Sequence, residues 1–121
     1  MERKFGYFNS AIESHQRALA IRIKLSGEEH ESTADTYYSL GITQLEKDDL
    51  EPALKSLQSA LTIRVKLFGE KHKATAESYY SIGLTQQKMG FLRPALQSKQ
   101  RALDIRVKKF GEEHKSTADG Y

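Results

Sequence analysis

The chain has 121 residues, about the size of one small domain, and it contains neither cysteine nor tryptophan. The absence of cysteine excludes disulfides, thiolate metal ligands and a cysteine nucleophile. The formal net charge of +3 is too small to indicate nucleic-acid binding, and the apolar runs of at most four residues are too short to span a bilayer. We therefore expect a soluble, cytoplasmic, helical protein with no membrane partner.

The sequence repeats itself with a period of 42 residues. The segment GEEHESTADTYYSLGITQ at 27–44 returns as GEKHKATAESYYSIGLTQ at 69–86 and begins again as GEEHKSTADGY at 111–121. Segments 27–68 and 69–110 share 24 of 42 residues. A fixed period of this length is typical of solenoids, in which each repeat stacks on its neighbours. The predicted units are helix B of a partial first repeat (1–26), two repeats (27–68 and 69–110) and the start of a further repeat (111–121).

Each repeat is predicted to contain two helices, which we name helix A and helix B. Helix B carries apolar residues at three- and four-residue steps, for example Leu54, Leu57 and Leu61, which gives one apolar face. In chain order we expect helix B at 7–25, helix A at 33–47, helix B at 50–68, helix A at 75–89, helix B at 92–110, and a sixth helix that begins near 116.

Short polar residues and glycine mark the predicted helix ends. Helix B should end in a left-handed residue at Gly27, Gly69 and Gly111. Capping boxes are expected at Ser32 with Asp35 and at Ser116 with Asp119. The middle copy has Ala74 instead and is predicted to lack this cap, while Asp48 and Asp49 are expected to cap the next helix B.

Glycine also occurs inside helix A, where it costs about 1 kcal/mol relative to alanine. Gly41 and Gly83 occupy equivalent places in the two copies. Four alanines share one face of helix B: Ala53, Ala60, Ala95 and Ala102. Small residues on both sides predict a close approach of the two helices.

These residues resemble tetratricopeptide repeats. The residues at the family spacing are Tyr37, Leu40, Gly41, Ala53 and Ala60, and again Tyr79, Ile82, Gly83, Ala95 and Ala102. The period and the phrase AL-x-IR-x-K-x-x-GE-x-H are similar to the long repeats of kinesin light chain and nephrocystin-3. The resemblance implies an all-α, right-handed superhelix of helix pairs, with five helices and a terminal stub. It also implies that helix A lines a concave groove and that Tyr37 and Tyr79 lie in the core.

The groove face of helix A supplies the candidate binding residues. They are Asp35, Tyr38, Ile42 and Leu45 in one copy, and Glu77, Tyr80, Leu84 and Gln87 in the next. Aromatic and aliphatic side chains beside carboxylates suit an extended peptide or a partner helix with basic residues beside apolar anchors. The alternative is that Tyr38 and Tyr80 fill the seam between adjacent A helices, and the sequence leaves both open.

The sequence gives little evidence for a catalytic site, a metal site or a nucleic-acid-binding surface. His30, His72 and His114 lie one repeat apart, roughly 10 Å, whereas zinc needs nitrogen ligands at about 2.0–2.1 Å, so they are expected to be structural loop residues. No nucleophile elbow or phosphate-binding loop occurs, so we expect neither an enzyme nor a cofactor. The basic residues of helix B lie on the face that the resemblance makes convex, where solvated charges are common: Arg22, Lys24, Arg64, Lys66, Arg106 and Lys108.

The predicted function is therefore a non-catalytic scaffold for protein–protein interaction. The alternative is a structural array that self-assembles through exposed repeat ends. Residues 27–68 carry eight carboxylates and four Lys or Arg, a net −4, whereas 69–110 carry three and nine, a net +6. Ends of opposite charge can associate head to tail.

Overall fold

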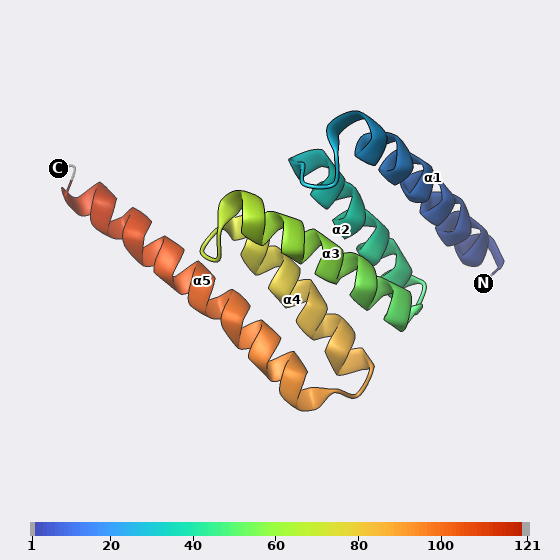
Figure 1. Ribbon diagram of the computed structural model, residues 1–121. Coiled ribbons are helices and arrows are strands. Elements are labelled where there is room, and N and C mark those ends of the chain that lie inside the picture. Colours follow the sequence, from blue (N-terminus) through green and yellow to red (C-terminus); the bar gives the residue numbers. More distant parts are fainter. Residues whose placement is uncertain (1, 120–121) are drawn as a thin grey trace.

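The computed structural model describes the backbone of residues 2–119 and the side chains of residues 6–109. It consists of five helices in one array: α1 (Glu2–Ser26), α2 (Glu31–Glu46), α3 (Leu50–Phe68), α4 (Lys73–Lys88) and α5 (Leu92–Asp119). Each helix packs on the next, with α1 at one end and α5 at the other (Figure 1). The described part of the chain contains no strand. The predicted all-α solenoid of helix pairs is confirmed.

The helix bounds agree closely with the prediction except at the two ends of the chain. Helix α3 has the predicted bounds, and α2 and α4 are each displaced by one or two residues. Helix α1 begins five residues earlier than predicted. At the other end, α5 continues through Gly111 to Asp119 instead of ending at 110.

The predicted left-handed glycines are confirmed at two of three places. Gly27 and Gly69 have φ of 87° and 85°. The prediction for Gly111 is wrong, because this residue lies inside α5, and the backbone of the expected sixth helix is the last part of α5. The capping side chains predicted there, Ser116 and Asp119, lie outside the described side chains.

The tertiary contacts of the loops explain this difference. Thr33 and Thr75, in helix A, each donate a hydrogen bond from Oγ1 to the carbonyl of the preceding glycine, at 2.9 and 2.8 Å. A sixteen-residue helix A then packs against the preceding helix B. Among the described helices, α5 packs only on α4, so no helix A holds the backbone at Gly111 in a turn. The helix therefore continues past Gly111, since each further residue adds one backbone hydrogen bond.

Histidine, rather than serine, caps the A helices. Nδ1 of His30 accepts a hydrogen bond from the Ser32 amide at 3.1 Å, and Nδ1 of His72 accepts one from the Ala74 amide at 3.0 Å. The predicted cap from Ser32 with Asp35 is therefore wrong. Because the donor is a backbone N–H, the copy with Ala74 keeps the same cap.

The acidic pair between α2 and α3 also acts differently from the prediction. Asp49 occupies the N-cap position of α3, but its side chain makes no capping hydrogen bond. Asp48 has φ of 72°, and the amides of Asp48 and Asp49 donate to the carbonyls of Leu45 and Gln44. This is a Schellman motif, so the pair ends α2. The equivalent left-handed residue after α4 is Gly90, with φ of 86°.

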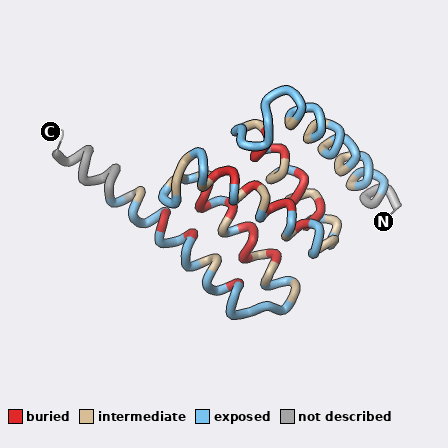
Figure 2. Tube along the Cα trace, viewed as in Figure 1, coloured by how far each residue is buried: buried red, intermediate tan, exposed pale blue. Residues whose placement is uncertain are grey.

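The core lies between the A and B helices, as the red segments of Figure 2 show. It is built largely from small and aliphatic side chains, including Ala34, Ala53, Leu57, Ala60 and Ala76, all fully buried. Two glutamines also reach it: Gln44 and Gln86 each accept a hydrogen bond at 2.7 Å, from Ser56 and Ser98 of the paired helix B. No described side chain of α1 is fully buried.

The predicted close approach of helices A and B is confirmed at both glycines. A Cβ atom added to Gly41 would lie 2.7 Å from Cγ of Leu57 and 3.2 Å from its backbone nitrogen. At Gly83 the same atom would lie 2.7 Å from Cγ of Lys99 and 3.2 Å from the Ala95 carbonyl oxygen. The glycines allow this approach, and it offsets their cost in helix propensity.

We expect Gly41→Ala to lower the free energy of unfolding by about 1–3 kcal/mol, because Leu57 is fully buried and cannot move away. Gly6→Ala is the matched control, since a Cβ there meets nothing within 4 Å and should raise stability by up to about 1 kcal/mol. Urea denaturation followed by circular dichroism measures both. Equal effects of the two substitutions would contradict the importance of the close approach.

Candidate protein-binding site

The arginine of α3 lies in the seam between the two A helices. Arg64 is only 4 % exposed. On α4 its Nη1 donates to the Ala74 carbonyl at 3.2 Å, to Glu77 at 3.1 Å and to the Ser78 hydroxyl at 2.9 Å. On α2 its Nη2 donates to Asp35 at 3.2 Å. One guanidinium therefore connects three helices.

Tyr38 completes this seam. The Arg64 guanidinium carbon lies 4.5 Å from the centre of the Tyr38 ring, within the range of a cation–π interaction. The Tyr38 hydroxyl is hydrogen-bonded to the Ser81 hydroxyl of α4 at 2.8 Å. Of the two interpretations that the sequence leaves open, these contacts place the Tyr38 side chain in the seam, with part of its surface still accessible.

The two predicted carboxylates lie on either side of Arg64 and remain accessible. The side chains of Asp35 and Glu77 are 62 % and 51 % exposed. They share one guanidinium, so this cluster has a net negative charge. The Nε atom of Arg64 is buried and has no hydrogen-bond partner among the described residues.

Tyr80 is the more accessible tyrosine of the candidate set. It is 37 % exposed, and the Arg106 guanidinium carbon lies 5.2 Å from its ring centre. The other four candidates differ in exposure: Ile42 and Leu84 are half-buried, Leu45 is buried, and Gln87 is exposed and accepts a hydrogen bond from Lys99. The structure thus gathers Asp35, Tyr38 and Glu77 around Arg64, and places Tyr80 one repeat further on, beside Arg106.

Sequence reasoning missed Arg64 and Ser81. The expectation that the helix B cations are solvated holds for Lys66 but is wrong for Arg64, because the long side chain extends from α3 into the seam. The arginine recurs at the same place in every copy of the repeat, but recurrence alone does not distinguish a seam residue from a surface residue.

The tyrosines expected in the core are also half-exposed. Tyr79 donates from its hydroxyl to Glu70 at 3.2 Å, and the guanidinium carbon of Arg101 lies 5.5 Å from its ring centre. Tyr37 is likewise half-buried. The core prediction for these two rings is therefore wrong, since both are only half-buried and the Tyr79 hydroxyl reaches Glu70 in the loop before its helix.

Within the described residues, no group of three or more His, Asp or Glu is placed to hold a metal ion. His30 and His72 act as helix caps, and the side chain of His114 lies outside the described residues. No described helix combines the length and apolar character needed to cross a membrane.

Comparison with protein families gives the class. The family model for the tetratricopeptide repeat matches residues 1–64 and 53–108. The chain therefore belongs to the tetratricopeptide-repeat family, whose members generally mediate protein–protein interactions or act as scaffolds. A search among curated proteins gave no match.

We expect Arg64→Ala to lower the free energy of unfolding by about 2–3 kcal/mol. Hydrogen bonds to charged groups contribute about 1.5–3 kcal/mol, and the remaining carboxylates stay solvated, which keeps the loss below that of a fully buried pair. Lys66→Ala is the matched control on the same helix. Lys66 pairs with Glu29 at 2.7 Å, but both side chains are exposed, so its removal should leave the urea midpoint nearly unchanged. A larger effect at Lys66 would contradict this assignment.

The seam also predicts a dependence on alkaline pH. Burial raises the pKa of Tyr38 above its ordinary value of 10.0, and the Glu77 charge adds to the increase, against opposing contributions from Ser81 and Arg64. The neutral phenol is thus favoured in the folded state. The stability that comes from holding the Tyr38 phenol in its neutral form is fully present below pH 10. This stability is lost as the pH rises through the higher pKa of the folded state.

Tyr38→Phe should therefore make the free energy of unfolding fall less steeply above pH 10 than in the unsubstituted chain. Absorbance at the tyrosinate band and urea denaturation at several pH values measure the two quantities. Superimposable stability curves for the two proteins would show that the Tyr38 phenol is not held in its neutral form by the seam.

Proposed function

We propose that this protein is a non-catalytic interaction scaffold whose A helices bind a peptide or partner helix on the groove face. The observation that carries the proposal is the exposure of Tyr80 in the same surface as two accessible carboxylates, Asp35 and Glu77. Tyrosine offers a large apolar surface and a hydroxyl that can remain hydrated, which suits a binding hot spot.

Charge favours a basic ligand. Asp35 and Glu77 are both bonded to Arg64, so one negative charge of the three groups is uncompensated. A lysine or arginine on the ligand could pair with it while an apolar anchor contacts Tyr80 and the half-buried Leu84. Tyr38 supports this surface from the seam, so its role in binding is mainly to hold Arg64 and the two helices in place.

Tyr80→Ala should weaken binding by at least about tenfold, because truncation of a hot-spot tyrosine typically removes this much affinity or more. The measurement is an array of peptides with Lys or Arg beside apolar residues, followed by titration of the peptides that bind. Tyr7→Ala is the matched control: Tyr7 is 69 % exposed on α1, outside the candidate set, and its removal should leave the affinity unchanged.

Circular dichroism should show equal helicity for the two variants. If no peptide binds, and sedimentation instead shows a mass that rises with concentration and falls with salt, the chain is the self-assembling array and the groove proposal fails. Equal loss of binding in Tyr80→Ala and Tyr7→Ala would also contradict the groove.

A further inference from the structure

Two equivalent hollows lie beside the loops that join helix B to helix A. Six positions line both of them. In the first hollow, between the loop before α2 and α3, they are Glu28, Glu29, Ser59, Thr62, Ile63 and Lys66. In the second, between the loop before α4 and α5, they are Glu70, Lys71, Arg101, Asp104, Ile105 and Lys108, each 42 residues further on.

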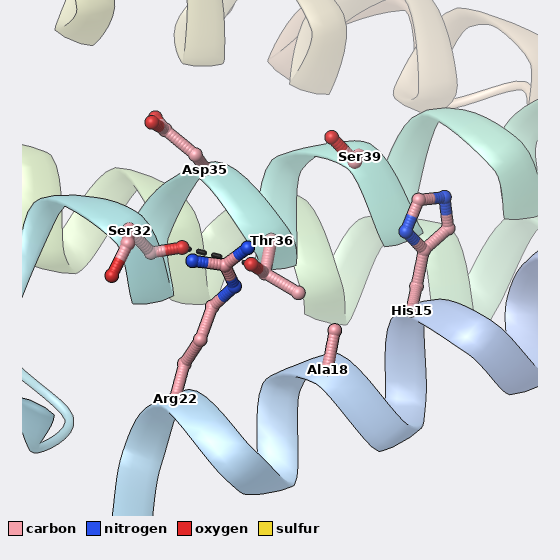
Figure 3. A pocket seen from close by; sticks show the side chains of 7 residues that line it. All are labelled: His15, Ala18, Arg22, Ser32, Asp35, Thr36 and Ser39. Atoms are coloured by element: carbon pink, nitrogen blue, oxygen red, sulfur yellow. Dashed lines mark hydrogen bonds between the residues drawn. The ribbon is translucent and has the colours of Figure 1, made fainter. Parts of the chain in front are cut away.

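Each of these hollows is formed within a single repeat. All the residues that line the first belong to 27–68, and all those that line the second belong to 69–110. The hollow in Figure 3 differs in this respect, because α1 and α2 of two successive units line it. The first and second hollows can therefore be compared position by position, without any contribution from neighbouring repeats.

In the first hollow, a carboxylate of the loop meets a cation of helix B. The Nζ atom of Lys66 donates a hydrogen bond to Glu29 at 2.7 Å. This hydrogen bond, together with the Glu29 charge, raises the pKa of Lys66 above its ordinary value of 10.5. The helix B cation is thus paired inside its own repeat.

The second hollow has a lysine at both of these positions. Lys71 stands where the first hollow has Glu29, and Lys108 stands where it has Lys66. Both lysines are exposed, and neither forms an ion pair with a described residue. The attraction that closes the first hollow is therefore replaced by a repulsion between like charges.

The other charged residues of the second hollow have partners of their own. Glu70 accepts hydrogen bonds from Arg101 and from the Tyr79 hydroxyl, both at 3.2 Å. Asp104 accepts one from the Gln100 side chain of the same helix at 2.9 Å. The second hollow is lined by three cations and two carboxylates, a net +1, whereas the first is lined by one cation and two carboxylates, a net −1. The sign of the charge is reversed between the copies.

An apolar residue lies at the base of the second hollow. Ile105 lines it and is 6 % exposed, as the equivalent Ile63 is 7 % exposed in the first. The base thus suits the methylene groups of a side chain, and the two lysines above it suit the carboxylate at the end of that side chain.

We propose that the second hollow binds an acidic segment of a partner protein, with an Asp or Glu carboxylate between Lys71 and Lys108. The ligand carboxylate takes the place that Glu29 occupies beside Lys66 in the first hollow. This surface is separate from the groove face of the A helices and takes a ligand of the opposite charge, so it does not depend on the groove proposal. A second copy of this chain is a poor source of the carboxylate, because its equivalent Glu29 is bonded to its own Lys66.

The test uses the full chain, labelled with ¹⁵N, and a tetraglutamate peptide blocked at both ends, in about 0.1 M salt, where charges further apart than about 10 Å are largely screened. With added peptide, the NMR signals of the backbone amides at 70–72 and at Lys108 should shift and saturate. The equivalent amides at 28–30 and at Lys66 should not shift. Higher salt should weaken the binding, since exposed charges are screened.

Two matched substitutions in the second repeat locate the binding. Lys71→Glu and Lys88→Glu make the same change of charge, and each introduces the residue of the first repeat, Glu29 or Glu46. Lys71→Glu should weaken binding by about fivefold or more, because an attraction is replaced by a repulsion. Lys88→Glu should leave the affinity nearly unchanged, because Lys88 is the last residue of α4, about 24 Å along the helix from the hollow.

The reciprocal substitution tests for a gain of binding. Glu29→Lys gives the first hollow the two lysines of the second, so the amides at 28–30 and at Lys66 should now shift with added peptide. The fold should tolerate this change, because the side chains of Glu29 and Lys66 are both exposed. A gain at the first hollow cannot arise from damage to the structure.

The inference is overturned if the shifts do not saturate below about 10 mM peptide, if Lys88→Glu weakens binding as much as Lys71→Glu, or if Glu29→Lys produces no binding. Tighter binding of inorganic phosphate than of the peptide would identify a phosphate group as the ligand and overturn the assignment to an acidic segment. Self-association that Lys71→Glu abolishes in sedimentation would identify a second copy instead of a partner. Tyr80→Ala should leave tetraglutamate binding unaltered, so failure of the groove proposal and failure of this one are distinguishable.

Discussion

The structure depends on one guanidinium held between two helices that barely touch each other. Helices α2 and α4 have little direct contact, and Arg64 of α3 fills the space between them with bonds to both. Its planar, always charged group offers several donors in a fixed geometry, which a lysine would not provide. The Tyr38 ring and hydroxyl then close the same seam. Together with the packing of α3 on α4, this contact joins the two repeats and shapes the candidate groove.

The same arginine has three different environments along the array. Arg64 is enclosed by helices on both sides, Arg106 lies beside Tyr80, and Arg22, among the described helices, faces only the helix that follows it (Figure 3). A repeat protein is therefore not uniform in function, because equivalent residues have different neighbours near each end of the described array. This explains why Arg64 holds the seam, while Arg106 at the equivalent position lies beside the accessible Tyr80.

The helix ends show how a repeat tolerates sequence change. A histidine side chain caps a backbone N–H, so the residue that carries this N–H can be serine in one copy and alanine in the next. Likewise, the left-handed residue of the Schellman motif is Asp48 in one copy and Gly90 in the other. What the repeat preserves at these places is a backbone conformation and its hydrogen bonds, and several residue types satisfy the same requirement.

The sequence by itself determined the features that depend on local chemistry and on periodicity. These are the 42-residue unit, the helices, the glycine turns at Gly27 and Gly69, and the tight contact at Gly41. Only the tertiary structure decided which side chains meet across repeats, because Arg64 and Ser81 are far from Tyr38 in the chain and no spacing rule connects them. It also decided the course of α5, which continues through Gly111, whereas Gly27 and Gly69 form turns that are bonded to Thr33 and Thr75 of the following helix A. The physical reason is the same in both cases: long-range packing selects among local conformations that the sequence leaves nearly equal in free energy.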